Sequence, residues 1–265
     1  MNLRNLLAPF VTDPARLEAA VQSLQQARFG QSSEAVSLAP TELPMPVDVD
    51  LQRAARCGFP EVVFGEGKTI DVILTVLSAQ QQSQQNSLVT RIAPEFVPTI
   101  TAQHPGAIFN PIARTLRLQQ QGNSDDQQPK AGPVYVVTAG SSDRPVAEEA
   151  IETLRWMDVH CDLIMDVGVA GPHRLLRHVD RLKTAAAIVC VAGMEAALPS
   201  VLGGHVPCPV IGVPTSVGYG ASLGGLTAML SMLTCCASNV VCVNIDAGFK
   251  GGYVAGLIAT RSHTD

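Results

Sequence analysis

Five polar, glycine-rich stretches in the second half of the chain each follow an apolar segment that is typical of a β-strand. They are residues 140–143, 166–174, 193–195, 214–220 and 244–249. In a parallel sheet covered by helices on both faces, ligands bind beyond the carboxyl ends of the strands. We therefore expect these stretches to converge on one edge of a sheet and to form a ligand site there.

The first stretch, Gly140-Ser141-Ser142-Asp143, precedes a predicted helix. Backbone amides and hydroxyls at a helix start can hold a phosphate, and Asp143 could accept a hydrogen bond from a ribose or cap the helix. An ordinary capped helix start explains the same residues, and the stretch taken alone favours that interpretation. It has neither the GxGxxG spacing nor a Walker A loop, so the usual dinucleotide fingerprint is missing.

Two residues are candidates for proton transfer. Glu195 follows an apolar strand and lies among apolar neighbours, a setting in which a carboxylate can exchange protons near neutral pH. An early-turn Glu that stabilises a helix N-terminus is an equally good interpretation. His173 precedes Arg174, which could pair with a phosphate. A single His is more often structural than catalytic, and its position after a strand favours the catalytic role somewhat.

The candidate nucleophile lies in the adjacent pair Cys235 and Cys236, which close an apolar helix. The chain has seven cysteines and no CxxC pair, which argues against a disulfide framework and against a zinc site. Core packing is the favoured role of Cys235. Cys236 stands at a predicted helix end and is expected to be partly exposed, but a helix C-terminus does not itself favour a thiolate. The residue types alone therefore favour a structural role for both thiols.

The elements that must position these residues follow a regular order from residue 134 onward. Strands are expected at 134–139, 161–167, 186–191, 210–213 and 240–245, with helices at 145–157, 173–183, from 194, at 223–234 and at the end of the chain. Continuous apolar strands that alternate with helices are typical of a parallel sheet buried on both faces. We predict an α/β fold, with a doubly wound parallel sheet in the C-terminal domain and a smaller α/β region before it.

The first half of the chain predicts this smaller region and its connections. Its strand candidates lie at 62–64, 88–91, 108 and 113–118, and its helix candidate at 69–77. An amphipathic helix is expected at 13–29, capped by Thr12 or Asp13, and residues 30–50 are expected to be an exposed connection. The predicted bounds are 1–50 for the N-terminal helix and linker, 51–118 for the small domain, 119–132 for a second linker and 133–265 for the catalytic domain.

Composition limits the partners of the chain. Hydrophobic residues make up 46% and charged residues only 15%, so we expect much of the surface to be covered by other subunits. The net charge is −5 and there is no Lys/Arg run, which argues against a nucleic-acid partner. No apolar run approaches the roughly 20 residues that span a bilayer, and the first residues lack a secretion signal. We expect a cytoplasmic homo-oligomer that does not bind membranes.

Several motifs, taken in order, resemble the LarB family, which makes the first intermediate of the nickel-pincer nucleotide cofactor. The matching stretches are 137–143, 145–150, 166–171, 173–174, 191–195, 197–200, 213–222, 236–237 and 243–246, with 56–69 upstream. The resemblance covers nearly everything from Leu51 onward. More distantly, 140–143, 173–174 and 210–214 resemble PurE, the aminoimidazole ribonucleotide carboxylase. That resemblance implies a PurE-like domain that assembles as an octamer.

The LarB resemblance implies a reaction. Nicotinic acid adenine dinucleotide is carboxylated at pyridinium C5 and its phosphoanhydride is hydrolysed, which gives pyridinium-3,5-biscarboxylate mononucleotide and AMP. CO2 or bicarbonate is the co-substrate, magnesium is a candidate assisting ion, and no tightly bound cofactor is expected. Because the pyridinium ring is electron-poor, a thiolate must first add at C4 before C5 can attack CO2.

The same resemblance implies roles for individual residues. Cys236, which Ala237 follows directly, matches the nucleophile of the family, and Glu195 is the first choice for the base that removes the C5 proton, with His173 second. The expected substrate-binding residues are Gly140, Ser141, Ser142, Asp143, Arg174, Gly193, Met194, Pro214, Thr215, Ser216, Val217, Gly218, Tyr219, Gly220 and Asp246. No metal ligands are identified.

The chain departs from the family pattern at two positions. Cys235 stands where a Ser is more usual, and Ala247 stands where the family has Asn. Upstream, the segment 56–69 could close over the adenylate with Lys68 or Arg56 at a phosphate, although capping and surface roles explain these residues equally well. Two other functions stay open at this point: an aminoimidazole ribonucleotide carboxylase or mutase of purine biosynthesis, and a nucleotide-binding protein without enzymatic activity.

Overall fold

The computed structural model describes residues 13–26, 47–119 and 131–262. The first of these segments is a single helix, α2 (Pro14–Gln26), which forms a unit of its own with its neighbouring residues. Asp13 caps it as expected, because its carboxylate accepts the amide of Ala15 at 2.9 Å. The last predicted residues of this helix, most of the connection expected at 30–50 and most of the linker expected at 119–132 lie outside the described residues.

The C-terminal half contains a five-stranded, all-parallel sheet with the order β6-β5-β7-β8-β9. The strands are β5 (Ala131–Thr138), β6 (Val159–Ile164), β7 (Ala187–Ala192), β8 (Val210–Pro214) and β9 (Val240–Cys242). Every residue of β7 and β8 is buried. This is the pattern of strands covered on both faces, so continuous apolar runs were the right signal.

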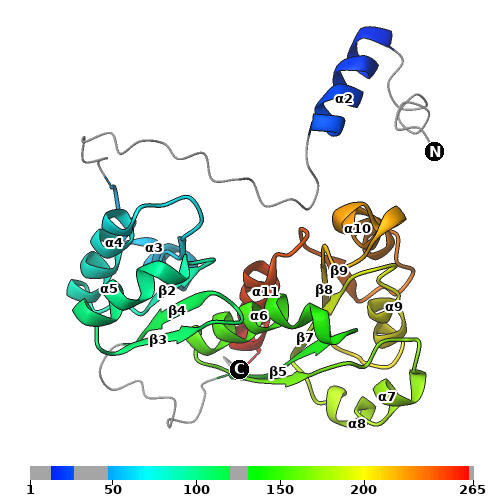
Figure 1. Ribbon diagram of the computed structural model, residues 1–265. Helices are drawn as coiled ribbons and strands as arrows, with labels where there is room; N and C mark the ends of the chain where they lie inside the picture. Colours follow the sequence, from blue (N-terminus) through cyan, green and yellow to red (C-terminus); the bar gives the residue numbers. More distant parts are fainter. Residues whose placement is uncertain (1–12, 27–46, 120–130, 263–265) are drawn as a thin grey trace. The chain divides into compact units, whose positions relative to one another are not determined.

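Two layers of helices cover the sheet (Figure 1). One layer is α6 (Arg144–Trp156) and α11 (Gly248–Arg261), and the other is α7 (Pro172–Leu176), α8 (Val179–Leu182), α9 (Leu198–Gly203) and α10 (Leu226–Leu233). Alternate residues of β7 serve the two layers: Val189 packs in the core with α6 and α11, whereas Cys190 packs in the core with the other helices. The predicted doubly wound α/β fold is confirmed.

A smaller four-stranded sheet with the order β1-β2-β4-β3 precedes this domain. Its elements are α3 (Arg53–Cys57), β1 (Val63–Phe64), α4 (Ile70–Gln82), β2 (Ser87–Thr90), the 3-10 turn η1 (Pro94–Phe96), α5 (Val97–Gln103), β3 (Ala107–Asn110) and β4 (Thr115–Leu118). Val47 and Val49 already pack against its core. The predicted small α/β region is therefore present, with α3 and α5 as helices that the sequence did not indicate.

The small domain is joined to α6 by buried charges. Arg117 of β4 donates to Glu152 at 2.6 Å, and both side chains are buried. Asn110 donates to Glu152 and to Glu148. Buried ion pairs hold their geometry because separating one partner leaves an uncompensated charge. These contacts fix the small sheet against the helix that begins at the predicted phosphate-binding stretch.

Some predicted helix and strand bounds were wrong. The helix expected from Met194 begins at Leu198, because residues 193–197 form a tight turn in which Met194 and Ala196 have positive φ. The helix expected at 173–183 is split into α7 and α8. The 3-10 turns η2 (Ser141–Asp143) and η3 (Gly220–Gly225) precede α6 and α10. No described helix is long and apolar enough to cross a membrane.

Candidate active site

A cavity of about 320 Å³ lies at the carboxyl edge of the five-stranded sheet. Its walls come from the segments that follow β5, β6 and β7 and from Val217 beyond β8. Among the predicted site residues it brings together Gly140, Ser142, Asp143, Arg174, residues 193–195 and Val217. The expectation that the polar stretches converge on one edge is therefore met for four of the strands.

Asp143 is the buried centre of this edge. One carboxylate oxygen accepts the amide of Gly140 at 2.9 Å, and the other accepts the hydroxyl of Thr215 at 2.7 Å. The amide of Gly193 also bonds to this side chain. The segments that follow β5, β7 and β8 are thus tied to one carboxylate, so Asp143 shapes the pocket floor in addition to lining it.

Burial raises the pKa of Asp143 above its ordinary value, and the hydrogen bonds from Thr215 and from the backbone amides oppose that rise. The balance explains why an acidic side chain can occupy the centre of the edge. Each oxygen has a donor, so the ionised form is compensated by hydrogen bonds rather than by a cation.

Glu195 stands on the turn between β7 and α9 and is exposed at the wall of the cavity. The amide of Met194 donates to the carbonyl of Val217 at 2.9 Å, which holds this turn to the segment after β8. Gly193 is required for that approach, since an added Cβ would collide with Val217 and Thr215. Glu195 is not in the first turn of a helix, so the helix-stabilising interpretation of this residue was wrong.

Arg174 is the cation of the cavity. It forms an ion pair of 2.8 Å with Asp166, the second residue after β6, and both side chains are partly exposed. A guanidinium in this position can meet a phosphate of a ligand. His173 is exposed on α7 beside Arg174 and is not among the residues that line the cavity.

The predicted residues after β8 divide into buried and exposed ones. Pro214 and Thr215 are buried beneath the cavity, whereas Ser216, Gly218, Tyr219 and Gly220 are exposed beyond it. Ser141 is also exposed. Asp246, in the turn after β9, accepts the amide of Ser216 at 2.9 Å. Asp246 therefore acts on the edge by holding the segment after β8.

Arg91 is a residue of this edge that the sequence interpretation missed. It follows β2 of the small sheet and donates to the carbonyl of Asp246 at 2.7 Å. The rule that polar residues after strands mark a site would have indicated it, had the rule been applied to the small sheet. Of the other upstream candidates, Arg56 is paired with Asp50, and Lys68 is exposed.

Cys236 lies at the opposite edge of the sheet. It follows α10 and precedes β9, so it is at the amino ends of the parallel strands, whereas the cavity is at their carboxyl ends. Strands of five or six residues separate the two edges by about 15 Å or more at about 3.3 Å per residue. Cys236 is exposed, and Cys235 is half-buried with its sulfur 3.0 Å from the hydroxyl of Ser200. One chain does not bring Cys236 to Glu195.

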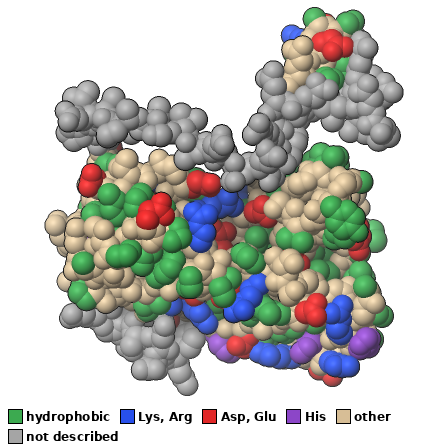
Figure 2. All heavy atoms as spheres, in the orientation of Figure 1, with side chains coloured by type: hydrophobic (Ala, Val, Ile, Leu, Met, Phe, Trp, Pro, Cys, Tyr) green, Lys and Arg blue, Asp and Glu red, His purple; other side chains and the backbone are tan. Residues whose placement is uncertain are grey.

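Exposed apolar side chains lie on the helices that flank Cys236. Val201 of α9 is 41% exposed, and Leu230 and Leu233 of α10 are 51% and 60% exposed. We call these three residues the amino-edge apolar surface. Figure 2 shows hydrophobic side chains at the surface over α10, at the upper right. Exposed apolar residues that gather in this way are typical of protein–protein contacts.

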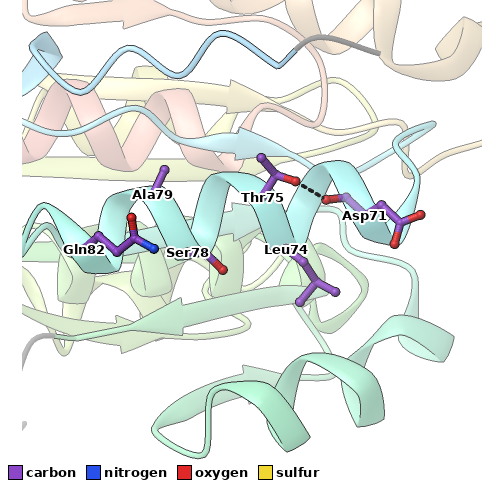
Figure 3. Close-up of a pocket in the computed structure, with 6 residues that line it drawn as sticks. All are labelled: Asp71, Leu74, Thr75, Ser78, Ala79 and Gln82. Carbon is purple, nitrogen blue, oxygen red and sulfur yellow. Dashed lines mark hydrogen bonds between the residues drawn. The ribbon is translucent and has the colours of Figure 1, made fainter. Parts of the chain in front are cut away.

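A second hollow lies along the outer side of α4, lined by Asp71, Leu74, Thr75, Ser78, Ala79 and Gln82 (Figure 3). Its residues all come from one helix, and the hydroxyl of Thr75 donates a hydrogen bond to the backbone carbonyl of Asp71. It lacks the convergent polar groups of the carboxyl-edge cavity, which is therefore the candidate site.

The described residues do not include three His, Cys, Asp or Glu side chains placed to hold a metal ion together. The donor set of the described residues therefore does not fit a magnesium site built from protein side chains alone.

Two family models match the chain in succession. The LarB/PurE-like N-terminal domain matches residues 45–121, and the AIR carboxylase domain matches residues 133–264. The chain belongs to the LarB family.

Curated relatives resemble either the whole chain or its second half. An uncharacterized protein of Methanocaldococcus jannaschii, MJ0165, is 36% identical over 99% of this chain and 98% of its own length. The N5-carboxyaminoimidazole ribonucleotide mutase of Mycobacterium leprae is 32% identical over 51% of this chain and 75% of its own length. A crystal structure of PurE from Treponema denticola covers 50% of this chain and 81% of that chain, with 19% identity and a TM-score of 0.40. The two family matches and the mutase relative support an enzyme of the carboxylase or mutase type.

Proposed function

We propose that this LarB-family protein carboxylates nicotinic acid adenine dinucleotide at C5 of the pyridinium ring and hydrolyses its phosphoanhydride, giving pyridinium-3,5-biscarboxylate mononucleotide and AMP. The observation that carries the proposal is the succession of a LarB-type N-terminal domain and an AIR carboxylase domain in one chain. A carboxylase-type domain alone would suit an aminoimidazole substrate as well.

The carboxyl-edge cavity supplies groups that suit such a substrate. Backbone amides at Ser142 and the guanidinium of Arg174 can meet a phosphate, and the apolar walls at Val169 and Val217 can cover a flat ring. The reacting nucleotide portion is proposed to bind in this cavity, which has a volume of about 320 Å³. The adenylate portion of a dinucleotide would then extend toward the exposed segment at Ser216 and Tyr219.

The chemistry needs a thiolate and a base. The sulfur of Cys236 adds to C4 of the pyridinium ring, and the ring nitrogen takes up the electron pair, which leaves an enamine. C5 then attacks CO2 and forms the new C–C bond. Glu195 removes the C5 proton, the electrons of that C–H bond return to the ring, and the bond between C4 and sulfur breaks. Hydrolysis of the phosphoanhydride consumes one water and releases AMP.

Cys236 and Glu195 lie at opposite edges of one sheet, which supports a site completed by a second copy of the chain. Cys236 of one subunit would face the carboxyl-edge cavity of the next, with the amino-edge apolar surface covered by the contact. This arrangement agrees with the expected homo-oligomer and would cover both the exposed thiol and the exposed apolar side chains of α9 and α10. We propose the octamer of the family as the assembly.

The proposal is tested by incubating the protein with bicarbonate and, separately, with nicotinic acid adenine dinucleotide, NAD or aminoimidazole ribonucleotide. We expect AMP and the biscarboxylate mononucleotide from the first substrate alone, and a covalent adduct on the intact protein. Cys236→Ala should abolish the adduct and lower product formation by about 1,000-fold or more. Cys235→Ala is the matched control and should retain both.

The outcomes separate the candidate functions. Carboxylated product from aminoimidazole ribonucleotide, with Cys236→Ala fully active, would indicate the purine-biosynthesis reaction that the mycobacterial mutase is named for. Binding without turnover of any substrate would contradict an enzyme. Loss of the adduct in Cys235→Ala and its retention in Cys236→Ala would show that the other thiol is the nucleophile.

A further inference from the structure

Arg91 crosses from the small domain to the carboxyl edge of the large sheet. Its Nη2 donates to the carbonyl of Asp246 at 2.7 Å, and its Nε lies 3.9 Å from the buried carboxylate of Glu149. Nη1 lies 3.6 Å from Glu66, and the guanidinium stacks over the ring of Phe64 at 5.8 Å. The side chain is thus held by groups of both domains at the turn after β9.

The turn that Arg91 holds is connected to the cavity by consecutive hydrogen bonds. Asp246 donates its amide to the carbonyl of Pro214 at 2.8 Å and accepts the amide of Ser216 at 2.9 Å. The next residue, Val217, lines the cavity and accepts the amide of Met194, which precedes Glu195. Any shift of the turn after β9 is therefore passed to two walls of the cavity.

Both ends of the contact have strained backbone. Arg91 has φ 50° and Asp246 has φ 53°, conformations that cost a residue with a side chain about 1 kcal/mol or more each. Such conformations persist where the surroundings over-determine them, and they are frequent at functional sites. Arg114 holds the backbone carbonyl of Arg91 from within the small domain. The guanidinium is therefore presented to Asp246 in one fixed direction.

We propose that Arg91 is a positioning residue of the carboxyl-edge site: it fixes the Asp246 turn, which in turn fixes Ser216 and Val217 and the segment that carries Glu195. Arg91 thereby connects the small domain to the carboxyl edge of the catalytic domain, without touching the reacting atoms. The effect on turnover rests on the proposed function, whereas the effect on the segment after β8 does not.

The first test needs no substrate. Hydrogen exchange of the backbone amides of residues 215–218 is compared among the wild type, Arg91→Gln and Arg56→Gln. We expect Arg91→Gln to exchange these amides about tenfold faster or more, because the turn that accepts the Ser216 amide is released. Arg56→Gln is the matched control, since it removes an arginine of the small domain that pairs with Asp50 and not with Arg91 or the turn, and it should keep wild-type exchange. Exchange in α6 and α11 should be unchanged in both variants.

The second test uses turnover of nicotinic acid adenine dinucleotide. Arg91→Gln should lower kcat/KM about tenfold, since displacement of a positioned group by a fraction of an ångström has effects of this size. Arg91→Lys, which keeps a donor for the Asp246 carbonyl, should recover part of the loss. If Arg91 acts through the turn, Arg91→Gln should cause little further loss in an Asp246→Ala background.

The outcomes are distinct. Unchanged exchange in residues 215–218 of Arg91→Gln, or equal acceleration in Arg56→Gln, would overturn the positioning role. Additive losses in the double variant would also overturn it, because they would place Arg91 on a separate path. If Arg91→Gln shows the expected faster exchange but the wild type forms no product, the proposed function would be contradicted and the positioning role of Arg91 would still be supported.

Discussion

The two edges of the five-stranded sheet are built from different kinds of group. At the carboxyl edge, the buried Asp143 joins three strand ends by hydrogen bonds and Arg174 pairs with Asp166. At the amino edge, Cys236 is exposed among apolar side chains of α9 and α10. At the carboxyl edge, the buried polar groups have hydrogen-bond partners within the chain. At the amino edge, apolar side chains are exposed to solvent, which is typical of a surface that contacts another protein. This difference is the basis of our proposal that each chain contributes one half to each of two shared sites.

The largest effect is expected where the carboxyl edge is most tightly joined. Asp143→Ala leaves the hydroxyl of Thr215 and the amides of Gly140 and Gly193 without their acceptor, so we expect a loss of about 3 kcal/mol in the free energy of unfolding. Turnover should fall about 100-fold because the cavity floor is displaced. Denaturant unfolding and steady-state kinetics measure the two effects.

The control for that variant is Ser142→Ala. Ser142 lines the same cavity and is exposed, so its replacement should change the free energy of unfolding by about 0.5 kcal/mol or less. Equal destabilisation by the two changes would mean that Asp143 is not the centre of the edge.

The second effect concerns the amino edge. Leu233→Glu places a charge on the amino-edge apolar surface, and burying an unpaired charge in a contact costs several kcal/mol. We expect a shift to smaller assemblies in light scattering and a loss of turnover of about tenfold or more, with little change in the monomer fold. Ile108→Glu, a change of an exposed apolar residue in the small domain, is the matched control. If Leu233→Glu kept the wild-type assembly size and turnover, the amino-edge apolar surface would not be a subunit contact that the activity requires.

The smallest effect is a pH dependence at the junction of the domains. Burial raises the pKa of Glu149 above its ordinary value of 4.5, and the amide of Phe249 and the charge of Arg91 oppose the rise. A carboxyl with a raised folded-state pKa stabilises the fold below pH 4.5 and loses that contribution as the pH rises through the raised value. As the pH rises, the free energy of unfolding of the wild type should therefore fall relative to that of Glu149→Gln. A constant or opposite difference would contradict the burial argument.

The fold was predictable because its signal is repeated along the chain. Each strand from Val134 onward is a continuous apolar run, and both faces of β7 are buried, so composition and period agree with the structure. Helix starts were less predictable. The turn at Met194 depends on the close approach of Gly193 to Val217, a contact between distant segments that local pattern does not contain.

The sequence predicted the edge of the sheet at which the cavity lies, but not every residue that acts on it. Polar residues after strands indicated Asp143, Arg174 and Glu195 together, because parallel strands end at the same edge. Arg91 follows β2 and so fits the same rule, but its partner, a backbone carbonyl 155 positions away in sequence, could not be read from local pattern. The position of Cys236 at the other edge follows from the direction of α10, so residue types and family resemblance could not by themselves say whether it shares a chain with the pocket.

The central claim is that Cys236 and Glu195 of different subunits form one site, and subunit mixing tests it most directly. Cys236→Ala and Glu195→Gln chains carrying different affinity tags are co-expressed, and assemblies with both tags are isolated. Each homo-oligomer should be inactive. In mixed assemblies about a quarter of the sites should receive both intact residues, so turnover should return to about a quarter of the wild-type value. Mixed assemblies no more active than the two homo-oligomers would contradict the shared site.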